Sequence, residues 1–259
     1  MPDAVQGRVA SVEKAMHILH AFSPHASQLS VRRLSERTGI PRSTAHAICV
    51  TLCDAGLLEA IRGGRYRLGP ALVELGGQVI AQTGLAEAGA GVLESLAREL
   101  GAEAHLGQLV GGWIVYVARV PMGRAIPMRN RVGLRAPAHL TGCGKAALAH
   151  LPPEQVRDLV VATCAAEDRP TPDLARLADE LAEARGRGHV VNASFQAGRA
   201  SVAAPVFDAT PAAIGGLSAA GPTAIFLPEF MARAVDRVRD AAEVVTARLG
   251  SGRGIRAAR

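Results

Sequence analysis

Residues 30–53 of this 259-residue chain have the pattern of two short helices joined by a tight turn. In the first helix Val31 and Leu34 share one face, because residues three apart lie on the same side of a helix. Ser30 stands where its side chain can cap the free amides at the helix start, and Gly39 stands where a left-handed residue ends a helix. The neighbouring segments are therefore expected to pack around this helix pair.

The second helix of the pair has one apolar and one polar face. Pro41 suits its first turn, where the missing N–H costs nothing. The apolar residues repeat at helical spacing and are Ala45, Ile48, Cys49 and Leu52. Short polar groups with an arginine at the N-terminal end are what a helix needs to read the major groove of DNA. The residues of this helix that we predict to contact DNA are Arg42, Ser43, Thr44 and His46.

Two flanking segments predict a winged helix-turn-helix. Residues 11–22 carry a helical apolar stripe that should pack behind the helix pair. Apolar runs at 57–61 and 66–68 flank two adjacent glycines, which is a hairpin signal. Arg62 and Arg65 would then stand at the wing tip, within reach of a phosphate backbone or minor groove. The alternative is that these two arginines are ordinary solvated turn residues.

The formal net charge of +6 is informative only where it clusters. Residues 30–46 hold four arginines against the single acid Glu36, and among these arginines we predict that Arg32 also contacts DNA. A second basic cluster lies in residues 251–259, which we predict to be a flexible tail.

Composition predicts a folded protein without a membrane segment. The chain is 49% hydrophobic and 20% charged, enough to bury the cores of two domains. No apolar run approaches the roughly 18 residues that span a bilayer, and the N-terminus lacks the apolar region of a signal peptide. Four cysteines without paired spacing fit a reducing compartment. We expect a soluble, cytoplasmic protein.

The C-terminal part has the pattern of an α+β domain. Residues 70–83 predict a linker helix, which the pair Gly76-Gly77 interrupts. Residues 84–250 then show a helix at 85–100, consecutive strands joined by turns, further helices, and a last helix from about Pro228 to Leu249. This order is typical of a mostly antiparallel sheet with helices before and after it.

Motifs for catalysis, metals and cofactors are weak in this chain. Gly144-Lys145 resembles the end of a P-loop, but Ala146 stands where the Mg²⁺-binding hydroxyl belongs. His46, Cys49 and Cys53 lie along one helix at a spacing that could hold a metal, yet both cysteines fall near the apolar face and no fourth ligand is apparent. We predict no enzyme, no cofactor and no metal.

The most site-like features of the C-terminal part are polar residues at a helix start and on strands. Residues 141–145 enter a helix whose free amides attract a carboxylate. Asn192, Ser201 and Ser218 could orient such a ligand in an otherwise apolar pocket. The alternative is that these glycines merely make a turn and these side chains pair with backbone.

Several segments together resemble one protein family. The N-terminal ones are residues 9–15 (VASVEKA), 39–46 (GIPRSTAH) and 64–70 (GRYRLGP). The C-terminal ones are residues 131–133 (RVG), Pro137, 141–145 (TGCGK) and 202–207 (VAAPVF). In this order they extend over residues 9–250 and are similar to the IclR (isocitrate lyase regulator) family of bacterial transcription factors.

The resemblance implies three parts: a winged helix-turn-helix DNA-binding domain at 1–69, a dimerising linker helix at 70–83, and a GAF-like α+β domain at 84–250 that binds a small metabolite. In this family the metabolite, called the effector, is commonly an organic or aromatic acid. Such proteins usually act as homodimers or homotetramers on palindromic double-stranded operators, and repress or activate catabolic genes.

The resemblance also implies an effector pocket. It places Met128 on an apolar wall, makes the backbone of Gly142 and Cys143 the donors to a carboxylate, and adds as lining residues Asn192, Ser201, Ser218 and Ala220. The chain departs from the common family pattern at Asn192, where an acid is frequent, at Ser201, where cysteine is frequent, and at Ala220, where a second serine can occur. Ala47 likewise stands where the recognition helix often has arginine.

Two other interpretations use the same residues. A metabolic enzyme with a basic assembly domain lacks the expected catalytic motifs, and a turnover assay with candidate acids tests it. A regulator whose C-terminal domain only dimerises would bind no acid, and thermal shift against a panel of acids tests it, because a ligand that binds raises stability by mass action.

Overall fold

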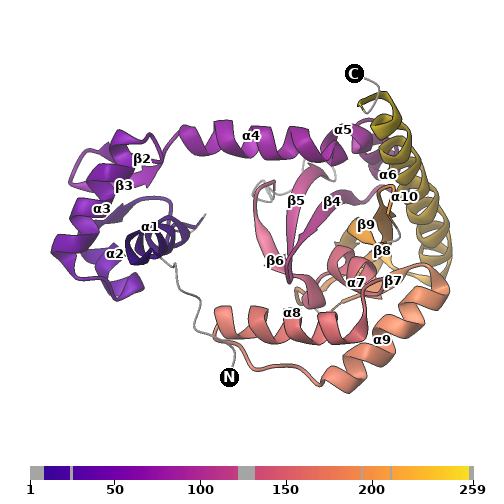
Figure 1. The fold of residues 1–259 in the computed structure, drawn as a ribbon. Coiled ribbons are helices and arrows are strands. Elements are labelled where there is room, and N and C mark those ends of the chain that lie inside the picture. The colour runs from indigo at the N-terminus through magenta and orange to yellow at the C-terminus, as the bar shows by residue number, and fades with distance from the viewer. Residues whose placement is uncertain (1–8, 24–25, 122–131, 194, 211, 257–259) are drawn as a thin grey trace. The chain divides into compact units, whose positions relative to one another are not determined.

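The computed structural model describes residues 9–23, 26–121, 132–193, 195–210 and 212–256 (Figure 1). The chain forms two compact units, Met1–Val79 and Ile80–Arg259. Each unit has a hydrophobic core of its own. The division falls within helix α4, Ala71–Thr83, which is a continuous helix despite Gly76 and Gly77.

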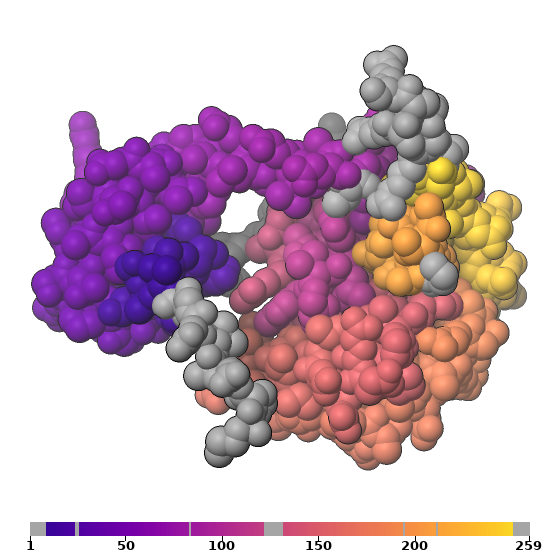
Figure 2. All heavy atoms as spheres, in the orientation of Figure 1, coloured from indigo at the N-terminus to yellow at the C-terminus, as the bar shows by residue number. Residues whose placement is uncertain are grey.

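Within its described residues the N-terminal unit consists of three helices and a small antiparallel sheet. The helices are α1 Ala10–His20, α2 Val31–Thr38 and α3 Arg42–Asp54. The strands are β1 Leu29–Ser30, β2 Leu58–Ile61 and β3 Arg65–Leu68, in the order β1-β3-β2. In Figure 2, α1 (indigo) lies directly on the purple surface of α2 and α3. This is the predicted winged helix-turn-helix, with β1 as an additional strand too short to leave a periodic signal.

Local sequence signals set the ends of α2 and α3. The Ser30 hydroxyl accepts a hydrogen bond from the backbone N–H of Arg33 at 3.4 Å, and Gly39 ends α2 with a φ of +70°. Pro41 lies one position earlier than predicted. Its ψ of 142° is extended, so α3 begins at Arg42 and Pro41 is the residue that precedes it. Among the described residues of this unit, the fully buried side chains are Ile18, Leu34, Ala45, Cys49 and Leu58.

Within the described residues, the C-terminal unit is built on a six-stranded antiparallel sheet of order β6-β5-β4-β9-β8-β7. The strands are β4 Glu103–Val110, β5 Trp113–Val120, β6 Arg135–Pro137, β7 Val190–Asn192, β8 Arg199–Phe207 and β9 Ala213–Pro222. The helices are α5 Leu85–Gly89, α6 Val92–Leu100, α7 Gly142–Leu148, α8 Pro153–Ala166, α9 Leu174–Arg187 and α10 Pro228–Arg256. This curled sheet with its helices confirms the predicted GAF-like α+β fold class.

Helices cover both faces of this sheet. Helices α5, α6 and α10 pack on one face, around Leu106, Val202 and Leu217. Helices α7, α8 and α9 lie on the other face, where Ile114 and Ala203 belong to a second core (Figure 1). Side chains on both faces of the sheet are therefore buried, and a polar side chain on the α7 face lies inside the protein.

Three segments differ from the sequence-based expectation or fall outside the structure. The helix predicted at 85–100 is divided into α5 and α6, because Gly91 adopts a φ of +75° between them. Helix α10 continues beyond Leu249 to Arg256, so most of the predicted flexible tail is helical. Met128 lies outside the described residues, and its predicted place on the pocket wall stays a prediction.

Helix α7 approaches its neighbours so closely that two glycines are needed. A Cβ on Gly144 would lie 2.1 Å from the carbonyl oxygen of Ala138, and a Cβ on Gly216 would lie 2.5 Å from the carbonyl oxygen of Cys143. Both obstacles are backbone atoms, which cannot rotate away as a side chain can. The second glycine of the segment that resembles a P-loop therefore has a packing role, and it seats α7 against the turn that precedes it.

This close approach predicts that Gly144→Ala destabilises the protein by about 1–3 kcal/mol, the usual range for an overpacked core. Gly186→Ala is a matched control, because Gly186 lies in α9 with no atom within 4 Å of an added Cβ. The control should raise stability by about 0.5–1 kcal/mol, since alanine favours a helix over glycine. Urea unfolding at one fixed protein concentration measures both, and equal stability of the two variants would contradict the packing.

Candidate functional site

Helix α3 presents the predicted polar face to solvent. Its apolar face is buried at Ala45, Cys49 and Leu52. On the opposite side Arg42 and His46 are exposed. Ser43 is exposed as well, and Thr44 is half-buried. The helix is therefore amphipathic, and its polar side is free to contact a partner.

The other predicted DNA contacts also lie on the surface of the N-terminal unit. The Arg32 guanidinium lies 3.6 Å from the Glu36 carboxylate, but both side chains are largely exposed, so the pair holds Arg32 only weakly. Arg62 lies in the turn between β2 and β3, which two left-handed glycines close. Arg65 is exposed one step further along, as the first residue of β3 and opposite Ile61.

The side chains of His46, Cys49 and Cys53 do not come together as ligands of one metal ion. Cys49 is fully buried, and burial raises the pKa of its thiol to about 11, so the thiolate needed for metal binding is disfavoured. His46 is exposed on the polar side of α3. Across the described residues no group of three or more His, Cys, Asp or Glu side chains is arranged to hold a metal ion.

A pocket opens between the start of α7 and the sheet face beneath it. Its empty volume is about 450 Å³, part of which is open to solvent. The lining residues are His105, Tyr116, Thr141, Gly142, Cys143, Asn192, Phe195, Gln196, Arg199, Ala200, Ser201, Ser218 and Ala220. This set brings together every predicted effector-binding residue that the structure describes. The pocket has the convergent polar groups of a small-molecule site.

Strand register explains why residues so far apart in sequence meet here. Ser218 of β9 lies opposite His105 of β4. Along the neighbouring row, Ala220 lies opposite Ser201 of β8, and Ser201 lies opposite Asn192 of β7. Residues two apart on a strand point to the same face, so both rows face α7. A slip of one residue in any pair would turn that strand's polar side chains away from the pocket.

Helix α7 closes the pocket from above. The Thr141 hydroxyl caps the helix by accepting a hydrogen bond from the Gly144 N–H at 3.0 Å. A Cβ on Gly142 would lie 2.7 Å from the Ser201 hydroxyl oxygen, so the backbone at the helix start rests directly on β8. Residues 141–143 therefore form a pocket wall as well as a turn.

The polar side chains of the pocket already make hydrogen bonds, one to another side chain and two to backbone carbonyls. Cys143 donates a hydrogen bond from its thiol to the Ser218 hydroxyl, with 3.2 Å between sulfur and oxygen. Burial raises the pKa of the Cys143 thiol to about 11, so it stays protonated at neutral pH and is a poor nucleophile. Asn192 donates to the Leu140 carbonyl at 3.0 Å, and the Ser201 hydroxyl donates to the Asn192 carbonyl at 3.4 Å.

Lys145 does not belong to the pocket. Its side chain is buried and its ammonium group lies 2.6 Å from the Glu180 carboxylate on α9. Its position next to the site-like glycines suggests an anion contact, but the helix turns it toward α9 instead. Lys145 thus joins α7 to α9.

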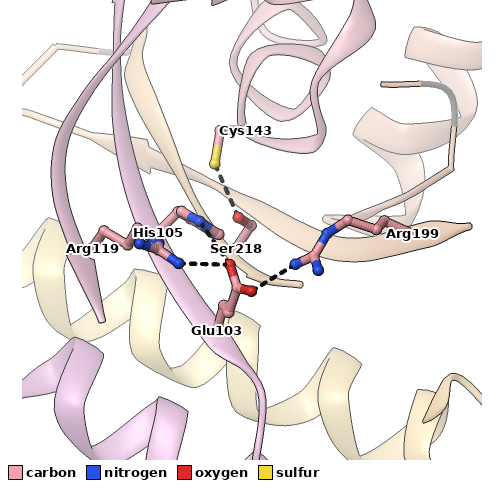
Figure 3. A network of polar contacts seen from close by, with 6 residues as sticks. All are labelled: Glu103, His105, Arg119, Cys143, Arg199 and Ser218. Carbon is pink, nitrogen blue, oxygen red and sulfur yellow. Dashed lines mark hydrogen bonds and ion pairs between the residues drawn. The ribbon is translucent and has the colours of Figure 1, made fainter. Parts of the chain in front are cut away.

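A buried charged network, which the sequence did not predict, lies next to the pocket. Glu103 accepts from Arg199 at 2.8 Å and from Arg119 at 3.3 Å, and its carboxylate lies 3.5 Å from His105 (Figure 3). The side chains of Glu103, His105 and Arg119 are each at least 93% buried. In the sequence, Glu103 and His105 alternate with alanine along β4. This alternation predicts an ordinary strand with one solvated face, unless both faces of the sheet are known to be covered.

Among the residues that the structure describes, none of the helices is both long enough and apolar enough to cross a lipid bilayer.

Comparison with known proteins matches both units. Residues 77–247 match the family model of the bacterial transcriptional regulator IclR C-terminal domain. Residues 11–61 match the family model of the IclR helix-turn-helix domain. The HTH-type transcriptional regulator XynR of Escherichia coli K12 is 31% identical over 214 residues, which cover 81% of this chain and 85% of XynR.

Solved structures show the same architecture. A crystal structure of an IclR-type transcriptional regulator from Silicibacter sp. TM1040 has a TM-score of 0.78 and 28% identity, and the match covers 93% of this chain and 96% of that one. An IclR homologue from Microbacterium hydrocarbonoxydans, crystallised with 4-hydroxybenzoate, has a TM-score of 0.75 and 23% identity over 92% of this chain and 98% of that one. These structures share the fold, and the two family matches with the sequence relative establish that the chain belongs to the IclR family of bacterial transcriptional regulators.

Proposed function

We propose that this protein binds palindromic operator DNA through α3 and the β2–β3 wing, and that a small organic acid in the α7 pocket controls this binding. The observation that carries the proposal is the amphipathic α3, which buries its apolar face and exposes Arg42, Ser43 and His46. Arg32 and Arg62 add phosphate contacts, and Arg65 supports the wing. Acting on DNA, the protein works in the cytoplasm.

The pocket supports an acid as the effector. The backbone N–H groups of Gly142 and Cys143 donate to a carboxylate, and hydroxyl or amide groups orient the rest of the molecule from Asn192, Ser201 and Ser218. Ala220 completes the wall and leaves room for the ligand. A structural neighbour that binds 4-hydroxybenzoate supports the same ligand class. Since none of the described lining residues supplies an activated nucleophile, we infer regulation rather than catalysis.

Dimerisation through α4 suits a palindromic operator. Val73, Leu75 and Val79 are each more than half exposed on this helix, which is costly for apolar side chains in water. A second copy would cover them and present two recognition helices to successive major grooves. Effector and DNA then couple reciprocally through their preference for one arrangement of the dimer or tetramer.

Arg42→Ala should weaken DNA binding. If the guanidinium contacts phosphate, affinity falls for all sequences and the slope of log K against log salt decreases by about 0.9. If it reads a base, the loss is about 1–3 kcal/mol and is confined to one operator position. Fluorescence anisotropy at several salt concentrations, on a duplex selected from a random pool by the wild-type protein, distinguishes these outcomes. Arg98→Ala, an exposed change on α6, is the control, and equal affinity of the two variants would argue against this docking.

Ala220→Leu should block effector binding by filling the pocket. When the concentration of a binding acid is 100 times its Kd, the wild-type protein is stabilised by about 2.7 kcal/mol. This stabilisation raises Tm by about 5–10 °C. This shift should disappear in Ala220→Leu and persist in Ala175→Leu, an exposed change at the start of α9. Differential scanning fluorimetry with a panel of organic acids measures it. If no acid shifts the wild-type Tm, the C-terminal domain only dimerises.

A further inference from the structure

Two guanidinium groups, those of Arg119 and Arg199, share the Glu103 carboxylate in the Glu103 network (Figure 3). The Arg119 side chain is 7% exposed and the Arg199 side chain 20% exposed. A guanidinium that has lost most of its contact with water forms strong hydrogen bonds with an anionic group. Because Arg199 shares its carboxylate with Arg119, a further anion beside Arg199 is favourable.

Arg199 is the member of the network that such an anion can reach. It lines the pocket together with His105, whereas the pocket wall includes no Asp or Glu among its described residues. One nitrogen of the Arg199 guanidinium contacts Glu103 at 2.8 Å. A guanidinium has five N–H donors in a flat fork, so this single contact orients the group and leaves donors for a ligand.

The position of Arg199 separates it from the place where the first carboxylate is proposed to bind. In Figure 3 the Arg199 guanidinium and the Cys143–Ser218 pair lie at different places along one sheet face. Arg199 lies two residues before Ser201 on β8, and Ser201 is the residue on which the Gly142 backbone rests. A ligand held at the start of α7 can thus extend along the pocket toward Arg199.

We propose that Arg199, oriented by Glu103, binds a second anionic group of the effector, so that the effector is a small dicarboxylic acid. This inference rests on the proposed effector function of the pocket. Glu103 is a positioning residue, because it holds the guanidinium and does not touch the ligand. Arg199 determines specificity, because a neutral group in place of the second carboxylate forms a weaker hydrogen bond with its guanidinium.

The test compares dicarboxylic acids with their monoamides, which have the same shape but one charge fewer. Calorimetric titration of the wild-type protein, with a panel of short aliphatic and aromatic diacids and the matching monoamides, should show about 10- to 100-fold tighter binding of at least one diacid, as for a hydrogen bond to a charged group. Arg199→Gln keeps a donor for Glu103 and should bind that diacid and its monoamide equally. Arg176→Met, an exposed change on α9, should retain the wild-type preference.

The outcomes separate this inference from the function on which it rests. Binding of no acid by the wild-type protein would overturn the effector function itself. A wild-type protein that binds diacid and monoamide equally, or an Arg199→Gln variant that keeps the preference, would overturn the role of Arg199 alone. If Arg199→Gln does not fold, Arg199→Lys decides, because lysine keeps the charge without the fork and should reduce the preference by about 3- to 10-fold.

Discussion

The pairing of β9 with β4 on one side and with β8 on the other is the constraint on which the C-terminal unit depends. Helices cover both faces of this sheet, so the side chains on both faces are inside the protein. The face toward α7 carries His105, Ser218 and Ser201, and the register brings these groups from three strands to one place. Burial and register together therefore produce a polar pocket in an otherwise apolar interior.

The close approach of α7 completes the pocket and limits what it can do chemically. Two glycines, Gly144 and Gly216, allow backbone to lie against backbone, so α7 sits low over the sheet. The same burial keeps the Cys143 thiol protonated, which suits a hydrogen-bonding wall better than a nucleophile. Among the described lining residues the permanent charge is that of Arg199, a member of the Glu103 network. These features support the proposal that the pocket binds a small anion.

The two units were predictable from sequence to different degrees. In the N-terminal unit the periodic apolar positions, the Ser30 cap and Gly39 define α2 and α3 locally, and the structure agrees with them. In the C-terminal unit the strands and most helices were predictable, but the break at Gly91 was not, because a glycine near a helix centre signals a break only when the packing requires one. Met128 lies outside the described residues, so its role stays a prediction.

By itself the sequence determined the element types, the amphipathic recognition helix and the family, since these follow from periodicity, caps and short motifs along the chain. Only the tertiary structure decided which polar residues are buried and which of them meet. Glu103, Arg119 and Arg199 are distant in sequence, and their contact depends on strand order and register, which no local pattern encodes. Lys145 shows the same limit, because only the packing of α9 beside α7 turns its charge away from the pocket and toward Glu180.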